Sequence, residues 1–299
     1  MQIIKNIKQM QVLSRKLRTQ AKTIGFVPTM GALHEGHLSL VRRSKKENTA
    51  TIISIFVNPA QFGPKEDFEK YPRDLKGDFK KLSGLKVDAV FIPDSKEMYP
   101  EGTCLLASSP CEAGQRSGTA VRFSASINVG HIGEILCGAS RPGHFNGVAT
   151  VVAKLFNIVI PDRAYFGQKD FQQTVIIKKL VTDLNFDIDI VVCPTVREAD
   201  GLAMSSRNSY LNNKQRKSSA ILYGALKYGE GLIRKGMDNR EAVRKEMQTL
   251  IKSEPLAKIE YIEIIRPETL EKMKKIKPPA VICIAVKIGP TRLIDNVII

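Results

Sequence analysis

The chain has 299 residues, of which 43% are hydrophobic, so it can form one large or two moderate folded domains rather than a disordered chain. No apolar run approaches the ~18 residues that a membrane-spanning helix needs, so we expect no membrane partner. The net charge of +16 raises the possibility of nucleic acid, but only 6% of the residues are aromatic and Trp is absent. We therefore interpret the charge as a solvated basic surface that attracts anionic metabolites, and expect no nucleic-acid partner.

Apolar runs and amphipathic segments alternate through the first two thirds of the chain. The predicted elements are, in chain order, a strand at 23–29, a helix at 38–47, a strand at 51–59, a helix at 74–85, a strand at 87–93, a helix at 149–162, a strand at 163–167, a long helix at 170–185 and a strand at 186–194. Strands separated by helices of this length predict parallel pairing. The fold class is therefore α/β, with a doubly wound, Rossmann-like parallel sheet that binds ligands at the carboxyl ends of its strands.

Two regions depart from this alternation. Thr103–Ile135 is rich in Ser, Gly and Ala and has little periodicity, which predicts a mobile excursion. After Thr195 two amphipathic helices, at 213–236 and 239–252, precede three strand-like segments at 258–265, 280–289 and 291–299. We expect a domain boundary near 196, which divides the chain into a Rossmann-like domain (1–195) and a smaller C-terminal α+β domain (196–299) with an antiparallel sheet.

The cysteines and the N-terminus point to a reducing compartment. The five cysteines are odd in number and form no C-x-x-C pair, which favours reduced structural thiols over disulfides or a zinc ribbon. The first residues, MQIIKNIKQM, have neither the apolar core nor the cleavage site of a secretory signal. We expect a cytoplasmic protein.

TMGALHEGH, residues 29–37, follows the first predicted strand and leads into a helix expected to begin near His37. The N–H groups and the positive dipole end of a helix N-terminus favour an anion. His34 and His37 lie three residues apart and can both face that anion. An incidental surface turn is the alternative; a zinc site lacks a third ligand at a suitable spacing, and the glycines do not form G-x-G-x-x-G.

Polar side chains also follow two other predicted strands. Asn58 and Gln61 offer neutral amides that can bind hydroxyl and carboxylate oxygens, unless VNPAQF is only a turn. Lys169 can bind phosphate and Asp170 can bind Mg²⁺, although a helix-capping Asp beside a solvated Lys fits equally well.

A later loop, DGLAMSSRNSY, brings two hydroxyls and a guanidinium together in Ser205, Ser206 and Arg207, and could close on a polyphosphate. H-x-G-H after the first strand, together with this M-S-S-R, resembles the nucleotidylyltransferase superfamily, relatives of class I aminoacyl-tRNA synthetases, in which two such motifs embrace ATP. Five longer segments resemble the pantothenate synthetase family, in order along nearly the whole chain: FVPTMGALHEGH, SIFVNPAQFGPKEDFEKYPR, GASRPGHFNGVATVVAKLFNI, YFGQKDFQQ and DGLAMSSRNSYL.

The resemblance implies condensation of pantoate with β-alanine, driven by cleavage of ATP to AMP and pyrophosphate through pantoyl adenylate. It implies that ATP is bound by Met30, Gly31, Ala32, Leu33, His34, Glu35, Gly36, His37, Gly167, Gln168, Lys169, Asp170, Val196, Met204, Ser205, Ser206 and Arg207. His34, His37 and Lys169 would be catalytic, with His37 as the proton donor.

The remaining roles also come from the resemblance. Gln61 and Gln173 would bind pantoate, Gln61 would later meet β-alanine, and Asn58 would support them. Asp170 would lie near Mg²⁺. The resemblance further implies a cytoplasmic homodimer with a lid-like smaller domain.

Two other functions are considered. Another adenylyl- or cytidylyltransferase of the superfamily would use HEGH and MSSR, but has no reason for VNPAQF and FQQ together. A basic RNA-binding protein on a degenerate nucleotidylyltransferase fold would have no need of intact His34, His37, Lys169 and Arg207.

Overall fold

The computed structural model describes residues 1–64, 66–100 and 125–299. The chain forms two compact units. Unit 1 consists of Met1–Leu33, His37–Phe166 and Ile176–Cys193, and unit 2 consists of His34–Gly36, Gly167–Val175 and Pro194–Ile299. Most of the excursion predicted at Thr103–Ile135 lies outside the described residues, and its described end contains the 3₁₀ helix η2 (Gly130–Gly133).

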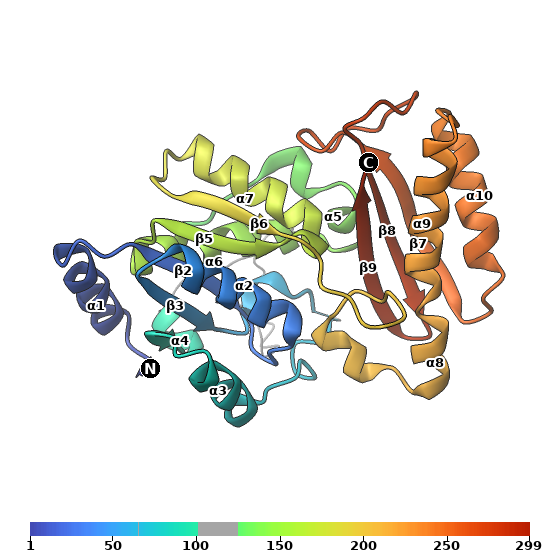
Figure 1. Cartoon of the computed structure of the whole chain (residues 1–299). Coiled ribbons are helices and arrows are strands. Elements are labelled where there is room, and N and C mark those ends of the chain that lie inside the picture. The colour runs from blue at the N-terminus through green and yellow to red at the C-terminus, as the bar shows by residue number, and fades with distance from the viewer. Residues whose placement is uncertain (65, 101–124) are drawn as a thin grey trace, which may run out of the picture. The chain divides into compact units, whose positions relative to one another are not determined.

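Unit 1 is built on a six-stranded sheet with the order β1-β4-β3-β2-β5-β6 (Figure 1). The strands are β1 (Gln2–Ile4), β2 (Ile24–Thr29), β3 (Ala50–Ile55), β4 (Ala89–Phe91), β5 (Arg163–Gly167) and β6 (Asp189–Cys193). From β1 to β5 neighbouring strands pair in parallel, and Phe26 of β2 lies opposite Ile52 on one side and Ala164 on the other. The predicted α/β fold with a parallel sheet is confirmed.

Helices cover the sheet of unit 1. The helices that begin before residue 184 are α1 (Ile7–Thr19), α2 (Glu35–Glu47), α3 (Leu75–Gly84), α4 (Ser95–Met98), α5 (Cys137–Ser140), α6 (His144–Val159) and α7 (Phe171–Asp183). Val27 and Ile53 of the sheet pack with Val41 of α2 and Leu82 of α3. Because successive side chains of a strand point to opposite faces, Phe26 faces the other side of the sheet. Helices α1 and α6 contact β2 as well, so the sheet is wound on both sides.

The chain order reverses next to β2. Strands β3, β4 and β1 lie on one side of β2, and β5 and β6 lie on the other. In open α/β sheets the carboxyl ends of the strands at such a reversal are where ligands bind. Thr29, Ile55 and Gly167 end the three strands concerned, and each is followed within a few residues by one of the motifs of the sequence.

Unit 2 contains an antiparallel sheet with the order β7-β8-β9, as predicted for the C-terminal part. Its strands are β7 (Ala257–Ile265), β8 (Val281–Ile288) and β9 (Thr291–Ile298). Helices α9 (Ile221–Arg234) and α10 (Arg240–Lys252) lie side by side along this sheet (Figure 1). Their buried side chains, such as Leu226 and Met247, form one core with Ile282 of β8.

Several predicted boundaries are wrong. The helix expected at 213–236 is two helices, α8 (Asn213–Ser218) and α9, and the Ser219 hydroxyl donates to the Arg216 carbonyl at 2.7 Å where they separate. The strand expected at 51–59 ends at Ile55, because Asn58 caps the 3₁₀ helix η1 (Pro59–Gln61).

The helix expected at 149–162 is α6, which begins five residues earlier and ends at Val159, before Ile160 adopts a φ of 50°. Two elements near the N-terminus, the short strand β1 and the helix α1, have no counterpart among the predicted elements. Asn6 caps α1 by accepting from the Gln9 backbone N–H at 3.2 Å. These differences move element ends but leave the sheet order unchanged.

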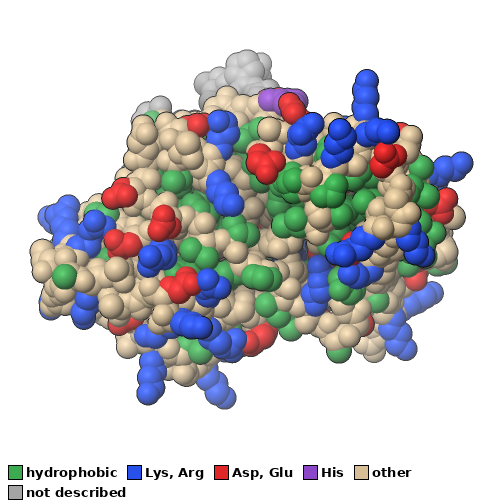
Figure 2. Space-filling view, turned by 45° about the horizontal axis from the view of Figure 1, so that its top comes forward, with side chains coloured by type: hydrophobic (Ala, Val, Ile, Leu, Met, Phe, Trp, Pro, Cys, Tyr) green, Lys and Arg blue, Asp and Glu red, His purple; other side chains and the backbone are tan. Residues whose placement is uncertain are grey.

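The surface carries many charged side chains, and the described cysteines are buried. Lys and Arg side chains are spread over the face shown in Figure 2, with Asp and Glu between them. Cys137, Cys193 and Cys283 are buried free thiols, and Cys104 and Cys111 lie outside the described residues. In the part of the chain that the structure describes, no helix has both the length and the apolar character required to cross a membrane.

Candidate active site

One buried carboxylate holds the loop between β2 and α2. Asp78 of α3 is fully buried, and its two oxygens accept hydrogen bonds from the backbone N–H groups of Ala32 at 2.9 Å and Leu33 at 2.7 Å. Gly31 has a φ of 83° and Ala32 a φ of 49°, so two successive residues are left-handed and the chain turns sharply. A Cβ on Gly31 would lie 3.2 Å from Asp78 Oδ2, which adds a steric reason for glycine there.

The Asp78 carboxylate occupies the backbone N–H groups of this loop that could otherwise bind an anion from outside. Burial raises its pKa, and the two backbone N–H groups oppose that rise by stabilising the carboxylate. Lys81, one turn further along α3, donates to the Leu33 carbonyl at 2.5 Å. Because Asp78 uses the N–H groups of Ala32 and Leu33, the donors of this loop best suited to an external anion are the histidines that follow.

His34 and His37 stand at the start of α2, which begins at Glu35, two residues earlier than expected. His34 Nδ1 accepts a hydrogen bond from the Gly36 backbone N–H at 3.2 Å, so the neutral ring carries its proton on Nε2. A Cβ on Gly36 would lie 2.9 Å from two atoms of that ring, which explains the glycine of H-x-G-H. His37 is half-buried in the first turn of α2, where the helix dipole favours anions.

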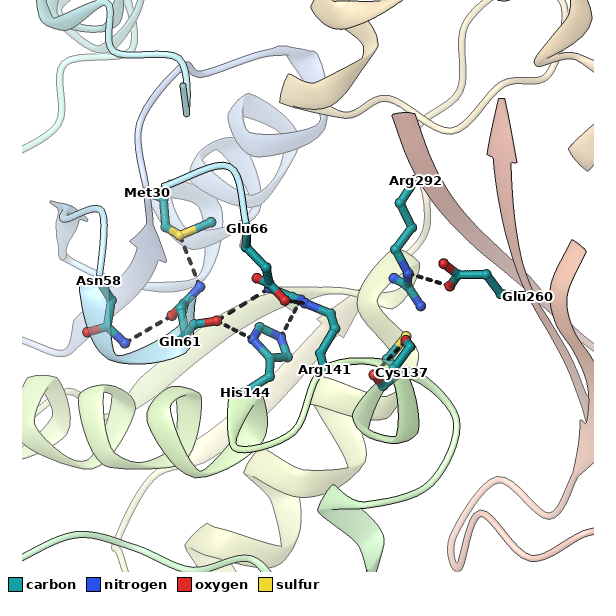
Figure 3. A network of polar contacts seen from close by, with 10 residues as sticks. Met30, Asn58, Gln61, Glu66, Cys137, Arg141, His144, Glu260 and Arg292 are labelled. Carbon is teal, nitrogen blue, oxygen red and sulfur yellow. Dashed lines mark hydrogen bonds and ion pairs between the residues drawn. The ribbon is translucent and has the colours of Figure 1, made fainter. Parts of the chain in front are cut away.

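Asn58, after β3, is a buried amide whose oxygen and nitrogen both have partners, and Figure 3 shows the contact of its nitrogen with Gln61. Its Oδ1 accepts from the Tyr99 hydroxyl at 2.6 Å and from the Ala60 N–H at 3.3 Å. Its Nδ2 donates to Gln61 Oε1 at 3.1 Å and to the Gly147 carbonyl at 3.2 Å. Burial raises the pKa of Tyr99, so its phenol keeps the proton it donates. Asn58 therefore orients the Gln61 side chain.

Gln61 is held at both its side chain and its backbone. Asn58 binds its side-chain oxygen, while Nε2 donates to Met30 Sδ at 3.0 Å, a weak acceptor. Its backbone carbonyl contacts Arg141 and His144 (Figure 3). The amide nitrogen is thus held in a fixed direction, and its partner, Met30 Sδ, is only a weak acceptor. Such a nitrogen suits a donor to a carboxylate or hydroxyl ligand.

In unit 2, Asn296 of β9 holds the turn that carries Lys169 and Asp170. Its side-chain nitrogen donates to the carbonyls of Gln168 and Lys169, each at 3.0 Å, and its oxygen accepts from Gln168 Nε2 at 3.1 Å. Lys169 Nζ lies 3.5 Å from Asp170 Oδ1, with side chains 19% and 48% exposed. The mostly buried ammonium of Lys169 suits binding of a phosphate. The more open carboxylate of Asp170 suits binding of a hydrated cation.

A second ion pair fixes the loop that precedes M-S-S-R. Arg197 donates to the buried Asp295 carboxylate at 2.6 and 3.1 Å, and to the Gly201 carbonyl at 3.0 Å. Its guanidinium also lies over the Tyr223 ring, 4.2 Å from the centroid. Asp295 precedes Asn296 and accepts from its backbone N–H at 2.8 Å, so one β9 segment anchors both loops of unit 2.

The residues of M-S-S-R are half-buried and partly held by their own backbone. The Met204 N–H donates to the Val196 carbonyl at 3.0 Å, which brings these two predicted ATP residues together. Ser205 Oγ accepts from the Arg207 N–H at 3.3 Å and caps the 3₁₀ helix η4 (Ser206–Tyr210).

The predicted site residues are divided between the units. Unit 1 holds Met30, Gly31, Ala32, Leu33, His37, Asn58 and Gln61, and unit 2 holds His34, Glu35, Gly36, Gly167, Gln168, Lys169, Asp170, Gln173, Val196, Met204, Ser205, Ser206 and Arg207. Gln173 is half-buried in the first turn of α7. Within residues 1–64, 66–100 and 125–299, no group of three or more His, Cys, Asp or Glu side chains is arranged to hold a metal ion.

Three residues that hold the loops of the site, Asp78, Asn296 and Arg197, were not predicted from the sequence. Each acts on a partner far away in sequence or through the backbone, and none lies in a recognisable pattern. The segment GASRPGHFNG, by contrast, was part of the family resemblance, yet it received no role.

A parallel sheet with H-x-G-H after the strand where its order reverses, and M-S-S-R in a later loop, has the arrangement that the resemblance to the nucleotidylyltransferase superfamily implies. The model of the pantoate-beta-alanine ligase family matches residues 2–298, and the chain belongs to this family. The predicted family and the predicted ligase class are therefore confirmed.

Three relatives illustrate the similarity. A pantothenate synthetase of Caldicellulosiruptor saccharolyticus is 51% identical and covers 100% of this chain and 99% of its own. The crystal structure of pantothenate synthetase from Thermus thermophilus is 39% identical, with a TM-score of 0.88 and 99% of both chains covered. A pantoate-beta-alanine ligase from Francisella tularensis, complexed with beta-gamma ATP and beta-alanine, is 38% identical, with a TM-score of 0.75, covering 100% of this chain and 97% of its own.

The role of Asp78 predicts a loss of stability in Asp78→Asn. The asparagine side chain has one oxygen, which can accept from only one of the two backbone N–H groups of Ala32 and Leu33. Its NH₂ group would face the other N–H, which would stay buried without an acceptor. We expect the free energy of unfolding, measured by urea titration, to fall by about 1–3 kcal/mol.

Asp74→Asn is the matched control. Asp74 caps the same helix by accepting from the Gly77 N–H at 2.9 Å, and asparagine caps a helix as well as aspartate does. Its unfolding free energy should stay within a few tenths of a kcal/mol of wild type. Equal stability of the two variants would contradict the role given to Asp78.

Proposed function

We propose that the chain condenses pantoate with β-alanine to pantothenate, using ATP and releasing AMP and pyrophosphate. The observation that carries the proposal is the position of three motifs: HEGH, VNPAQF and GQKD follow β2, β3 and β5, three neighbouring parallel strands at the reversal of the sheet order. Family membership along residues 2–298 supports the same activity.

The chemistry requires two steps, because an amine cannot displace an oxygen from an unactivated carboxylate. In the first step a pantoate carboxylate oxygen attacks the α-phosphorus of ATP, the bond to the bridging oxygen breaks, and pyrophosphate leaves. In the second step the β-alanine amine attacks the acyl carbon of pantoyl adenylate, AMP leaves, and the amine loses a proton. Negative charge grows on the phosphates during the first step, so fixed donors and cations aimed at them lower its barrier.

We assign the phosphates to His34, His37, Lys169 and Arg207. The N–H of Gly36 fixes the His34 tautomer, and Asn296 fixes the backbone of Lys169, so these donors need little reorganisation during the reaction. His37 is the proposed proton donor to the departing phosphate oxygen. Val196 and Met204, already joined backbone to backbone, are proposed to contact the adenosine part of ATP.

We assign the organic acids to the amide side chains. Gln61 donates to pantoate and later to β-alanine, Gln173 donates to pantoate, and Asn58 orients Gln61. A neutral amide suits this task because it binds a carboxylate without forming an ion pair that would weaken its nucleophilicity.

Mg²⁺ fits the donor set of this site. Mg²⁺ keeps several waters and is commonly held by one or two carboxylates together with substrate phosphates. Asp170, with a side chain that is 48% exposed, supplies one such carboxylate. When bound with ATP, the ion would neutralise charge on the phosphates.

The resemblance also supports coarser features of the proposal. We propose that residues 1–195 bind ATP and pantoate, that residues 196–299 act as a lid-like domain, and that the enzyme is a cytoplasmic homodimer. ATP binding has direct support from the ligand of the Francisella tularensis relative.

Product analysis tests the proposed activity. Wild-type protein incubated with MgATP, pantoate and β-alanine should yield pantothenate and AMP in equal amounts, with pyrophosphate, as measured by liquid chromatography and mass spectrometry. Formation of ADP, or of AMP without pantothenate, would contradict the proposal.

The role of His37 predicts that His37→Ala slows adenylation about 10²- to 10⁴-fold, the range for a lost acid or charge-stabilising donor. Single-turnover formation of AMP measures the effect, and circular dichroism checks the fold. His131→Ala is the control, because His131 is exposed in η2 and has no proposed role. Near-normal adenylation in His37→Ala would reject its assignment.

A further inference from the structure

The segment RPGH, which received no role from sequence, forms a tight turn before α6. The His144 N–H donates to the Arg141 carbonyl at 3.1 Å, and Gly143 between them has a φ of 76°. Proline at the second position and a left-handed glycine at the third are typical of a type II turn. The turn places the side chains of Arg141 and His144 next to each other.

Both side chains meet at the backbone carbonyl of Gln61 (Figure 3). His144 Nδ1 lies 2.8 Å from this oxygen, and Arg141 Nη2 donates to it at 3.3 Å. A carbonyl oxygen only accepts, so Nδ1 carries the proton and Nε2 accepts from Arg141 Nη1 at 2.8 Å. The tautomer of His144 is thus fixed by its two partners.

Glu66 completes the arrangement. Its two oxygens accept from Arg141 Nε at 2.8 Å and Nη2 at 2.6 Å, a bidentate pair whose side chains are only 13% and 23% exposed. Gly147 then lets η1 approach α6 closely: a Cβ there would lie 2.1 Å from the Ala60 carbonyl oxygen and 2.9 Å from the Gln61 Cα. The backbone of Gln61 is therefore fixed by Arg141 and His144, with Glu66 holding Arg141, and by the close approach at Gly147.

We propose that Arg141 and His144, supported by Glu66, are positioning residues that set the affinity for the two carboxylate substrates by fixing the backbone of Gln61. The inference rests on the proposed function, in which Gln61 binds pantoate and then β-alanine. Asn58 fixes the side-chain amide and His144 fixes the carbonyl, so the direction of the Gln61 donor depends on both. A small displacement of the Gln61 amide would lengthen and misalign its hydrogen bonds to both substrates and so weaken their binding.

Two substitutions of His144 separate its hydrogen bond from its packing. His144→Asn keeps an N–H donor at the position of Nδ1 along the side chain. His144→Phe keeps the volume of the ring and its contact with Phe145, whose centroid lies 4.8 Å away, but removes the hydrogen bonds to the Gln61 carbonyl and to Arg141. We expect His144→Phe to lower kcat/KM for pantoate and for β-alanine about 10- to 100-fold, mainly through KM, and to leave KM for ATP unchanged. His144→Asn should retain most of the wild-type values.

Arg141→Lys is a second test, because an ammonium cannot replace the planar fork that contacts Glu66, His144 and Gln61 together. It should raise the same two KM values. Arg244→Ala is the matched control: Arg244 also joins a carboxylate, Glu241, to a backbone carbonyl, that of Ile262, within unit 2. It should leave all three KM values unchanged.

The outcomes distinguish the inference from the proposed function. Absence of pantothenate with the wild-type protein would overturn both. Normal wild-type turnover with unchanged KM values in His144→Phe and Arg141→Lys would overturn the positioning role alone. A Phe variant that is more active than the Asn variant would show that ring packing matters and would also overturn it.

Discussion

Parallel pairing of β2 with β3 on one side and β5 on the other is the constraint on which the candidate site depends. Strands in the middle of such a sheet are covered on both faces, so β2, β3 and β5 are made mainly of apolar residues. The polar residues therefore stand in the segments that follow the strands. Because the strands are parallel, they end at the same edge of the sheet, and the chain order reverses beside β2.

Buried polar side chains, rather than regular hydrogen bonding, hold these segments in shape. Asp78 binds the N–H groups after β2, Asn58 orients Gln61 after β3, and Asn296 binds the carbonyls after β5. Leaving any one of these buried partners unpaired costs about 1–3 kcal/mol, so each segment strongly prefers one conformation. Catalysis of phosphoryl and nucleotidyl transfer depends on this kind of preorganisation, because the protein supplies mainly position and charge.

The parts of the structure that depend on local pattern could be predicted from sequence. Apolar runs such as TIISIF predicted the strands, and the turn from strand to helix around His34 was predicted as well. The interruption at Ser219 was missed, because a helical pattern continues through it on both sides. The positions of Asp78 and Asn296 were also missed: Asn296 meets Gln168 at a separation of 128 residues, and no local period reports such a contact. Arg141 and His144 stood in a recognised segment, but their role requires knowing that η1 packs on α6.

The central claim is that pantoate is activated as an adenylate before the amine arrives, and isotope exchange tests it most directly. Labelled pyrophosphate should enter ATP when wild-type protein, MgATP and pantoate are present and β-alanine is absent, because the first step is reversible while the adenylate stays bound. Lys169→Ala should depress this exchange strongly, since Lys169 is proposed to stabilise charge that grows in the transition state. Exchange that requires β-alanine would contradict the order of the steps, and exchange without pantoate would show that the site activates a different acid.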